Sequence, residues 1–507
     1  MRRLGILAIT TAWLRGLPLA TRPTVAAPAA DIDALDTFIA KALVDYRVPG
    51  AAVAVIHDGH IVLLKGYGVR DVTKPDVVDE HTIFQLASLS KAFTGAAAAA
   101  VVDAGKLDWD TPITTYLPEF VGYDPYMTRW LTTRDLLAHR TGWREFAGDQ
   151  LDSFGYSRAE ILHRLRYFKP AYSLREVAQY SNPGIFVAAE VAARAAGGTW
   201  NDLVEQRLFA PLKMTRSGTS VNDLSDPNAS ANHALIDGQT VLVAATNQDT
   251  MGAAGSVTST AADMANWMAM LLNEGTFGDR PVLTPQSVTE LFKRSMVAAP
   301  SFADLPPINE STTGFYFGLG VDSFDYAGHH IVEKAGALSG VRTVMTLLPA
   351  RQSGIVVLAN LNLTAFPEAV RAFYIHQLLG MDTRINQQEI VAINQQLQDL
   401  LKPPARPEHP GPFVWPLSAL PGTYENDYYG CATISLVGDT LSVAFGPANY
   451  AGSLTHWENG QFMLLFPGAT QAYDGITFSI GAGGTADGFT SATYGLFTRV
   501  RPATDQA

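Results

Sequence analysis

The segment from Ala92 to Val102 is almost wholly apolar and includes five consecutive alanines. A run of this kind favours a helix, and a helix without a polar face must be enclosed on all sides by other elements. The 507-residue chain is 47% hydrophobic and only 17% charged, which is enough apolar material for such an enclosure. This length predicts two or three domains.

The order of strand-like and helix-like segments predicts the fold class. Residues 31–48 have apolar side chains at helical spacing, and two β-rich runs joined by the turn His57–His60 follow them. A helix-rich region spans about 132–272, and strand signals return after Gly314 until a final helix at about 367–379. This order predicts an α+β domain, with an antiparallel sheet built from both ends of the domain and flanked by helices, and a helical subdomain between them.

Composition divides the rest of the chain. Residues 401–417 contain six prolines and predict a stiff linker. Short β-runs with turn signals at Gly438-Asp439 and Asn459-Gly460 follow, and they predict a small all-β barrel or sandwich. We therefore expect a large domain at 31–382, a helical segment with the Pro-rich linker at 383–416, and a small β domain at 417–501.

The N-terminal residues 1–29 have the order of a secretory signal peptide. Two arginines precede an apolar stretch, and Ala27-Pro28-Ala29 is a plausible cleavage site. This predicts a periplasmic or secreted protein, although Arg15 interrupts the apolar stretch and a disordered tail is the alternative. The stretch is too short to span a membrane, and no other run of 18 apolar residues occurs, so we expect no membrane anchor.

The charge balance restricts the partners. A net charge of −12 disfavours nucleic acid and anionic membrane surfaces, because both select basic patches. We therefore expect a small-molecule ester, amide or peptide substrate. The single cysteine, Cys431, cannot form an internal disulfide and leaves the compartment open. The sequence also leaves open whether the chain forms a homo-oligomer.

A serine and a lysine stand at the head of the apolar helix. If the helix begins near Ser88, then Ser88 and Lys91 lie on one face, about 5–6 Å apart between Cβ atoms. Burial in so apolar a helix lowers the pKa of a lysine toward that of a useful base. The alternative is a capping serine with a lysine that reaches solvent.

Two further sequence motifs place polar side chains at the end of a predicted helix or strand. Asn182 precedes Pro183 and predicts the N-cap of a helix, with Tyr180 in the loop before it. Lys334 lies at the end of a predicted strand, and Gly336 permits close approach of a ligand. Both motifs also have a purely structural interpretation. Asn182 could simply cap the helix while Tyr180 packs, and Lys334 could be an edge-strand lysine that prevents aggregation.

Together these elements resemble the serine β-lactamase and penicillin-binding-protein superfamily: Ser88-x-x-Lys91, Tyr180-x-Asn182 and Lys334-x-Gly336. A tyrosine at the first position of the second element resembles the pattern of the class C-like branch. This branch includes class C β-lactamases, family VIII esterases, D-aminopeptidases and related serine peptidases. Similar segments extend over about residues 35–380. The C-terminal part resembles the lipocalin-like β domain that some of these hydrolases carry.

The resemblance implies a role for each residue. Ser88 would be the nucleophile that forms an acyl-enzyme, with Lys91 and Tyr180 as the acid/base pair in an order that the sequence leaves open. The backbone N–H groups of Ser88 and Ala337 would form the oxyanion hole. The remaining substrate-binding residues would be Asn182, Lys334, Gly336 and Arg342. No metal or organic cofactor is expected.

One departure bears on the substrate. β-Lactamases and penicillin-binding proteins usually carry a hydroxyl residue between the lysine and the glycine of the third element, where it helps to hold the β-lactam carboxylate. Here this residue is Ala335, although Arg342 could supply a carboxylate anchor instead. The departure favours an esterase or a peptidase, which could act on D-residues or on cyclic and modified peptides.

Other constellations are weaker. The histidine pairs His57/His60 and His329/His330 lack an acidic or cysteine partner at zinc-like spacing. No G-x-S-x-G element supports a Ser-His-Asp hydrolase, and packing and capping explain His139 and Asp263. The sequence thus predicts an exported serine hydrolase. The alternatives are a β-lactamase or DD-peptidase acting on penicillin-like or D-Ala-D-Ala substrates, and a sensor that acylates without turnover.

Overall fold

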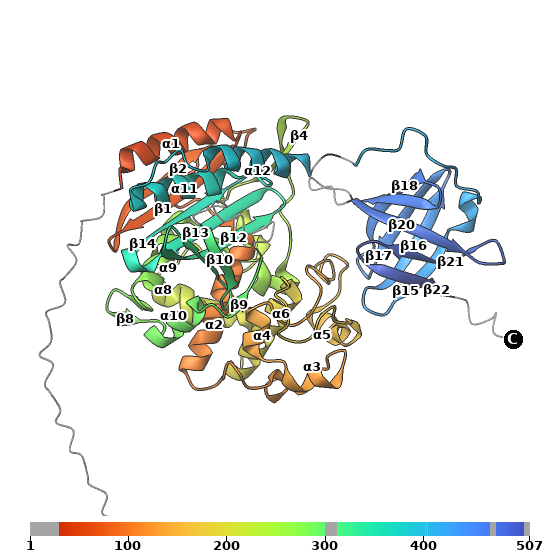
Figure 1. Cartoon of the computed structure of the whole chain (residues 1–507), viewed down its shortest axis with the longest axis horizontal. Helices are drawn as coiled ribbons and strands as arrows, with labels where there is room; N and C mark the ends of the chain where they lie inside the picture. The colour runs from red at the N-terminus through yellow and green to blue at the C-terminus, as the bar shows by residue number, and fades with distance from the viewer. Residues whose placement is uncertain (1–29, 300–311, 401, 403, 467–472, 501–507) are drawn as a thin grey trace, which may run out of the picture.

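A computed structural model describes residues 30–299, 312–400, 402, 404–466 and 473–500 (Figure 1). The predicted signal peptide lies outside the described residues. Helix α1 (Ile32–Asp45) follows Asp31, whose side chain accepts a hydrogen bond from Ala34 N at 2.9 Å and so caps the helix. The predicted hairpin follows as β1 (Gly50–His57) and β2 (His60–Gly68).

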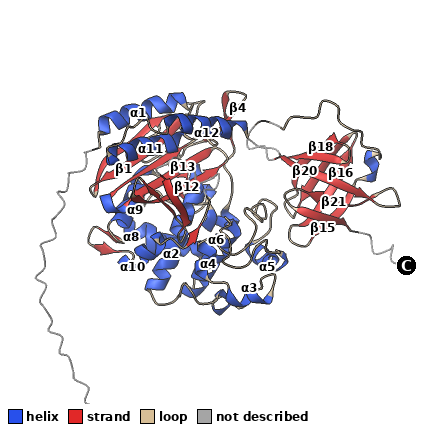
Figure 2. Cartoon of the chain, viewed as in Figure 1, coloured by secondary structure: helices blue, strands red, loops and turns tan. Residues whose placement is uncertain are grey.

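The large domain is built on one eight-stranded antiparallel sheet (Figure 2). Its order is β2-β1-β14-β13-β12-β11-β10-β9, so strands from the two ends of the domain meet where β1 pairs with β14. This confirms the predicted α+β class. The later strands are β9 (Met296–Val297), β10 (Thr312–Phe317), β11 (Asp322–Tyr326), β12 (His329–Leu338), β13 (Val341–Leu348) and β14 (Ser353–Ala359).

Helices cover both faces of this sheet (Figure 2). Alternate side chains of β1 enter two different cores, because successive residues of a strand point to opposite faces. One core contains α1 and α11 (Phe366–Leu379), and the other contains α9 (Ala261–Leu272) and α2 (Ser90–Asp103). Helix α2 is buried along nearly its whole length, as its apolar sequence predicts.

The region between β2 and β9 supplies the predicted helical subdomain. Helix α6 (Asn182–Ala196) contacts α2 and begins at the last residue of the sequence element Tyr180-x-Asn182. The remaining helices of this region are α3 (Pro125–Trp130), α4 (Thr133–Leu137), α5 (Arg158–Arg164), α7 (Trp200–Val204), α8 (Ala210–Leu212) and α10 (Pro285–Phe292). Three two-stranded antiparallel sheets complete the region: β3 (Phe84–Gln85) with β6 (Thr258–Ser259), β4 (Asn232–Ile236) with β5 (Gln239–Val243), and β7 (Thr276–Phe277) with β8 (Arg280–Pro281).

The C-terminal part is a closed eight-stranded antiparallel barrel, which decides between the predicted barrel and sandwich (Figure 1). Helix α12 (Gln387–Asp399) precedes it, and β15 closes the barrel by pairing with β22. The strands are β15 (Gly422–Asn426), β16 (Gly430–Val437), β17 (Thr440–Phe445), β18 (Tyr450–Glu458), β19 (Gln461–Leu465), β20 (Tyr473–Ile480), β21 (Ala486–Ser491) and β22 (Gly495–Arg499).

Candidate active site

Ser88 lies in a tight turn just before α2. The turn is a single 3₁₀ segment (Ala87–Leu89), and the α-helix begins at Ser90 rather than near Ser88. Ala87 has a φ of 53°, in the left-handed region that costs an L-residue about 1–2 kcal/mol. The turn leaves Ser88 half-buried while its neighbours Ala87 and Leu89 are fully buried.

Two proton-bearing groups meet at the Ser88 hydroxyl. Lys91 Nζ and Tyr180 OH each donate a hydrogen bond to Ser88 Oγ at 2.9 Å. Lys91 is fully buried, and its Nζ also donates to the carbonyl oxygen of Ala254 at 2.8 Å and lies 4.8 Å from the centre of the Tyr180 ring. The structure thus brings together the first residues of two sequence elements that are 92 positions apart.

The third element lies against the same turn. A Cβ at Gly336 would stand 2.1 Å from the carbonyl oxygen of Leu86 and 3.0 Å from Ser88 N, so only glycine fits at this end of β12. Two residues earlier on the strand, Lys334 Nζ lies 5.3 Å from the centre of the Tyr180 ring. Lys334 is itself buried and donates to Asp322 Oδ2 on β11 at 2.5 Å.

Asn182 does not cap α6, contrary to the prediction. Ser181 is the N-cap, and its hydroxyl accepts a hydrogen bond from Gly184 N at 3.1 Å. The Asn182 side chain is therefore not needed for the helix terminus, and its Nδ2 donates to Asp149 Oδ2 at 2.6 Å. The other oxygen of Asp149, Oδ1, is buried and has no hydrogen-bond partner among the described residues.

Asp149 is a half-buried residue beside the site, and one of its carboxyl oxygens, Oδ1, is fully buried. Burial raises its pKa to about 7, while the hydrogen bond from Asn182 and the charge of Lys91 act in the opposite direction. The carboxyl is thus close to half-protonated at neutral pH. Because the unfolded chain loses this proton near pH 4, the contribution of the neutral carboxyl to stability is complete below pH 4 and is lost as the pH rises to about 7.

Asp149→Asn should remove this loss. We expect the free energy of unfolding of the variant, minus that of the wild type, to increase between pH 5 and pH 7 by at most about 1.4 kcal/mol per pH unit, and then to level off. The subtraction removes the titration of the groups that do not interact with Asp149. Urea unfolding of both proteins at several pH values measures it. A difference that stays constant over this range would contradict a raised pKa at Asp149.

His139 packs against Tyr180. The two rings have centroids 4.6 Å apart, and His139 Nδ1 accepts a hydrogen bond from Ser181 N at 3.2 Å. Burial, together with the charges of Lys334 and Lys91, holds the pKa of His139 well below its usual value. The ring is therefore neutral and protonated on Nε2, and it fixes the loop that carries Tyr180.

A pocket of about 690 Å³ opens at Ser88. Tyr180, Asn182 and Ala337 line it, and none of its described lining residues is a lysine or an arginine. Arg342 does not line this pocket, so the prediction that it anchors a substrate carboxylate is wrong. It is buried in an ion pair with Glu368, in the layer where α11 covers the sheet.

Neither a metal nor a membrane helix is indicated in the part of the chain that the structure describes. No group of three or more histidine, cysteine, aspartate or glutamate side chains is arranged there to hold a metal ion. Among the same residues, no helix combines the length and the apolar character that a membrane span requires.

The fold and the site define the class of protein. A family model described as Beta-lactamase matches residues 35–380, which is most of the chain, and the chain therefore belongs to the β-lactamase family. A second model, described as a domain of unknown function (DUF3471), matches residues 406–503, which include the barrel.

Curated relatives carry related names. An unguisins hydrolase of Aspergillus campestris is 27% identical over 62% of this chain and 59% of its own length, and one of Aspergillus violaceofuscus is 24% identical over 78% and 75%. A β-lactamase of Escherichia coli is 25% identical over 70% of this chain and 95% of its own. The octameric penicillin-binding protein homologue from Pyrococcus abyssi shares the fold, with a TM-score of 0.62 at 19% identity over 92% of this chain and all of that one.

Sequence reasoning missed three residues of the site. His139 was assigned only a packing role, and Asp149 and Asp322 were not singled out. His139 lies in the segment "LLAHRTGW", within residues 35–380 over which the chain resembles the superfamily, so its position in the sequence is a usable signal. No pattern in the sequence marks Asp149, because it reaches Asn182 only through the tertiary fold.

Proposed function

We propose that this protein is an exported serine hydrolase that cleaves an amide or ester bond through an acyl-enzyme on Ser88. The observation that carries the proposal is the pair of hydrogen bonds to Ser88 Oγ from Lys91 Nζ and Tyr180 OH, both at 2.9 Å. A hydroxyl becomes a useful nucleophile when a positioned base takes its proton. Export rests on residues 1–29 alone, and the N-terminal sequence of the mature protein tests it.

The proposed reaction has two halves. Ser88 Oγ attacks the carbonyl carbon while its proton passes to Lys91 or Tyr180, and the leaving group departs with a proton from the same pair. Water then attacks the acyl-serine, gives up a proton to the pair, and Ser88 regains its own. Lys334 Nζ lies 5.3 Å from the centre of the Tyr180 ring, so the lysine is close enough to act on this residue through its charge.

The oxyanion of each tetrahedral intermediate would lie at the N–H groups of Ser88 and Ala337. The close approach of Gly336 to Ser88 N, and the position of Ala337 in the pocket wall, support this assignment. Donors of this kind are each worth about 3–4 kcal/mol of transition-state stabilisation.

The pocket favours a neutral substrate over a β-lactam. Ala335 offers no hydroxyl to a carboxylate, and the Arg342 guanidinium is paired with Glu368. Asn362 lines the pocket, and both its Nδ2 and its Oδ1 are buried without a hydrogen-bond partner among the described residues. An amide in the substrate offers an acceptor for Nδ2 and a donor for Oδ1, so we favour a peptide or another amide-bearing substrate.

The experiment is a comparison of kcat/KM on four chromogenic substrates: p-nitrophenyl acetate, p-nitrophenyl butyrate, a D-alanyl p-nitroanilide and nitrocefin. We expect turnover of the esters and the anilide, with nitrocefin the poorest of the four. Asn362→Leu should lower turnover of the anilide about tenfold and leave the acetate unchanged, because of these two substrates only the anilide carries an N–H that can donate to Asn362 Oδ1. Nitrocefin as the best substrate would instead favour the β-lactamase alternative.

A further inference from the structure

One residue of the barrel lies in the wall of the active-site pocket. Tyr450, the first residue of β18, lines the same cavity as Ser88 and Tyr180. All other described residues of this wall come from the large domain. The barrel is therefore part of the active-site surface, although the family model that matches it is described only as a domain of unknown function.

The barrel is fastened to the large domain next to this residue. Ala448 N, in the turn before β18, donates a hydrogen bond to the carbonyl oxygen of Phe154 at 2.9 Å. The Phe154 ring stacks on Phe445 of β17, with centroids 5.0 Å apart and planes within 9°. Gly155 has a φ of 87°, and a Cβ there would stand 2.7 Å from Ala448 N, so this contact requires glycine.

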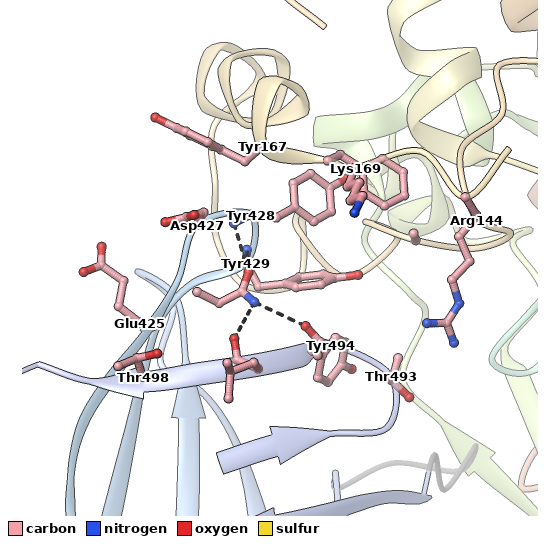
Figure 3. A pocket seen from close by; sticks show the side chains of 16 residues that line it. Arg144, Tyr167, Lys169, Glu425, Asp427, Tyr428, Tyr429, Thr493, Tyr494 and Thr498 are labelled. Carbon is pink, nitrogen blue, oxygen red and sulfur yellow. Dashed lines mark hydrogen bonds between the residues drawn. The ribbon is translucent and has the colours of Figure 1, made fainter. Parts of the chain in front are cut away.

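A second set of contacts holds the same loop of the large domain, residues 146–156, from the β15–β16 turn. Tyr156 OH donates to the carbonyl oxygen of Tyr429 at 3.0 Å, and Tyr429 OH accepts from Gly148 N at 3.3 Å. Figure 3 shows Tyr428 and Tyr429 of the barrel beside Lys169 and Arg144 of the large domain.

The clamped loop itself belongs to the active site. Asp149, Gln150 and Ser153 line the Ser88 pocket, and Asp149 accepts the hydrogen bond from Asn182. The barrel thus contacts this loop at both of its ends and adds Tyr450 beside it. The Tyr450 ring is held in turn by Phe466, with centroids 4.7 Å apart, so it presents a fixed wall.

We propose that the barrel is a specificity element of the active site and that Tyr450 limits the size of the apolar group that the pocket accepts next to the reacting carbonyl. This inference rests on the proposed hydrolase function. Apolar side chains of the large domain, including Val243, Leu338 and Leu363, line the pocket together with the Tyr450 ring. An aromatic ring in the wall of a pocket excludes larger substrates by contact and not by charge.

Tyr450→Ala should shift the preference toward long acyl chains. We expect the ratio of kcat/KM for p-nitrophenyl octanoate to that for p-nitrophenyl acetate to rise about tenfold, because removal of a large side chain enlarges the pocket. Tyr450→Phe keeps the ring and should keep the wild-type ratio. Tyr473→Ala removes a barrel tyrosine that does not line the pocket and is the matched control, with the ratio again unchanged.

The outcomes separate this inference from the proposed function. If the wild type hydrolyses neither ester nor anilide, the hydrolase proposal fails. If the wild type is active and Tyr450→Ala leaves the chain-length ratio unchanged, or lowers both rates equally, the inference about the barrel is wrong. Should the alanine variant unfold, Tyr450→Leu retains much of the packing and should shift the ratio in the same direction by a smaller factor.

Discussion

Ser88→Ala is expected to lower kcat on the best ester or anilide substrate by about 10⁴-fold or more and to leave the fold intact. The variant keeps the pocket and the proposed oxyanion donors but has no atom that can form the acyl-enzyme. When catalytic residues act as one unit, removal of a single member abolishes nearly all of the activity that the unit provides. Ser88 is half-buried and its Oγ only accepts the two described hydrogen bonds from side chains. Because Ser88 lines the pocket, a water molecule can take the place of its hydroxyl as the acceptor for Lys91 Nζ and Tyr180 OH, and the melting temperature should change little.

Ser90→Ala is the matched control for this prediction. Ser90 is two positions away and fully buried, and its Oγ accepts a hydrogen bond from Val257 N at 2.9 Å. Its loss leaves a buried N–H unpaired, which should lower the free energy of unfolding by about 1–3 kcal/mol while most of the activity remains. Full activity in Ser88→Ala, or complete loss in a folded Ser90→Ala, would contradict the assignment of Ser88.

Lys91→Met should separate activity from stability. We expect kcat to fall by about 10³-fold, because the general acid–base contribution of a positioned side chain is typically 10²–10⁴-fold. We also expect the free energy of unfolding to rise by about 1 kcal/mol, since an apolar side chain of similar length avoids the desolvation of a fully buried ammonium. Steady-state kinetics and urea unfolding of the same preparation measure the two effects.

The matched control is Lys65→Met. Lys65 pairs with Asp36 at the surface, at 2.8 Å and half-exposed, so its loss should change neither activity nor stability by a measurable amount. If Lys91→Met lowered stability and kept activity, the lysine would be a structural residue of α2 and not a member of the acid/base pair. The alternative of a lysine that reaches solvent is excluded, because Lys91 is fully buried.

Local patterns in the sequence were sufficient for the parts of the site that lie on one element. The three-residue spacing of Ser88 and Lys91 places both side chains on one side of a helical turn, and the structure joins them at 2.9 Å. The precise start of α2 was not predictable, because Ala87 adopts a left-handed φ that propensity does not indicate. The apolar run after Lys91 did predict a fully buried helix.

Contacts between distant segments were beyond such patterns. The resemblance indicated that Tyr180 and Lys334 meet at Ser88, but the carboxylates Asp149 and Asp322 reach the site only through the fold. For Arg342 the sequence predicted a place in the site that the fold does not give it. It follows the third element closely in sequence, yet Glu368 on α11 holds it in a buried ion pair away from the pocket.

The barrel shows the same limit at the scale of domains. Turn signals and alternating residues predicted its strands, and closure followed from the pairing of β15 with β22. That a single tyrosine of the barrel lines the Ser88 pocket depends on the packing of Phe445 against Phe154, which no short pattern encodes.

Covalent labelling distinguishes Ser88 from any other nucleophile in the protein. A p-nitrophenyl alkylphosphonate forms a stable Ser–O–P bond with an activated serine and releases p-nitrophenolate. Intact-mass spectrometry and peptide mapping should find one phosphonyl group per chain, on the peptide that contains Ser88, and none in Ser88→Ala. A label on another residue, or an unlabelled wild type that still hydrolyses esters, would show that Ser88 is not the nucleophile.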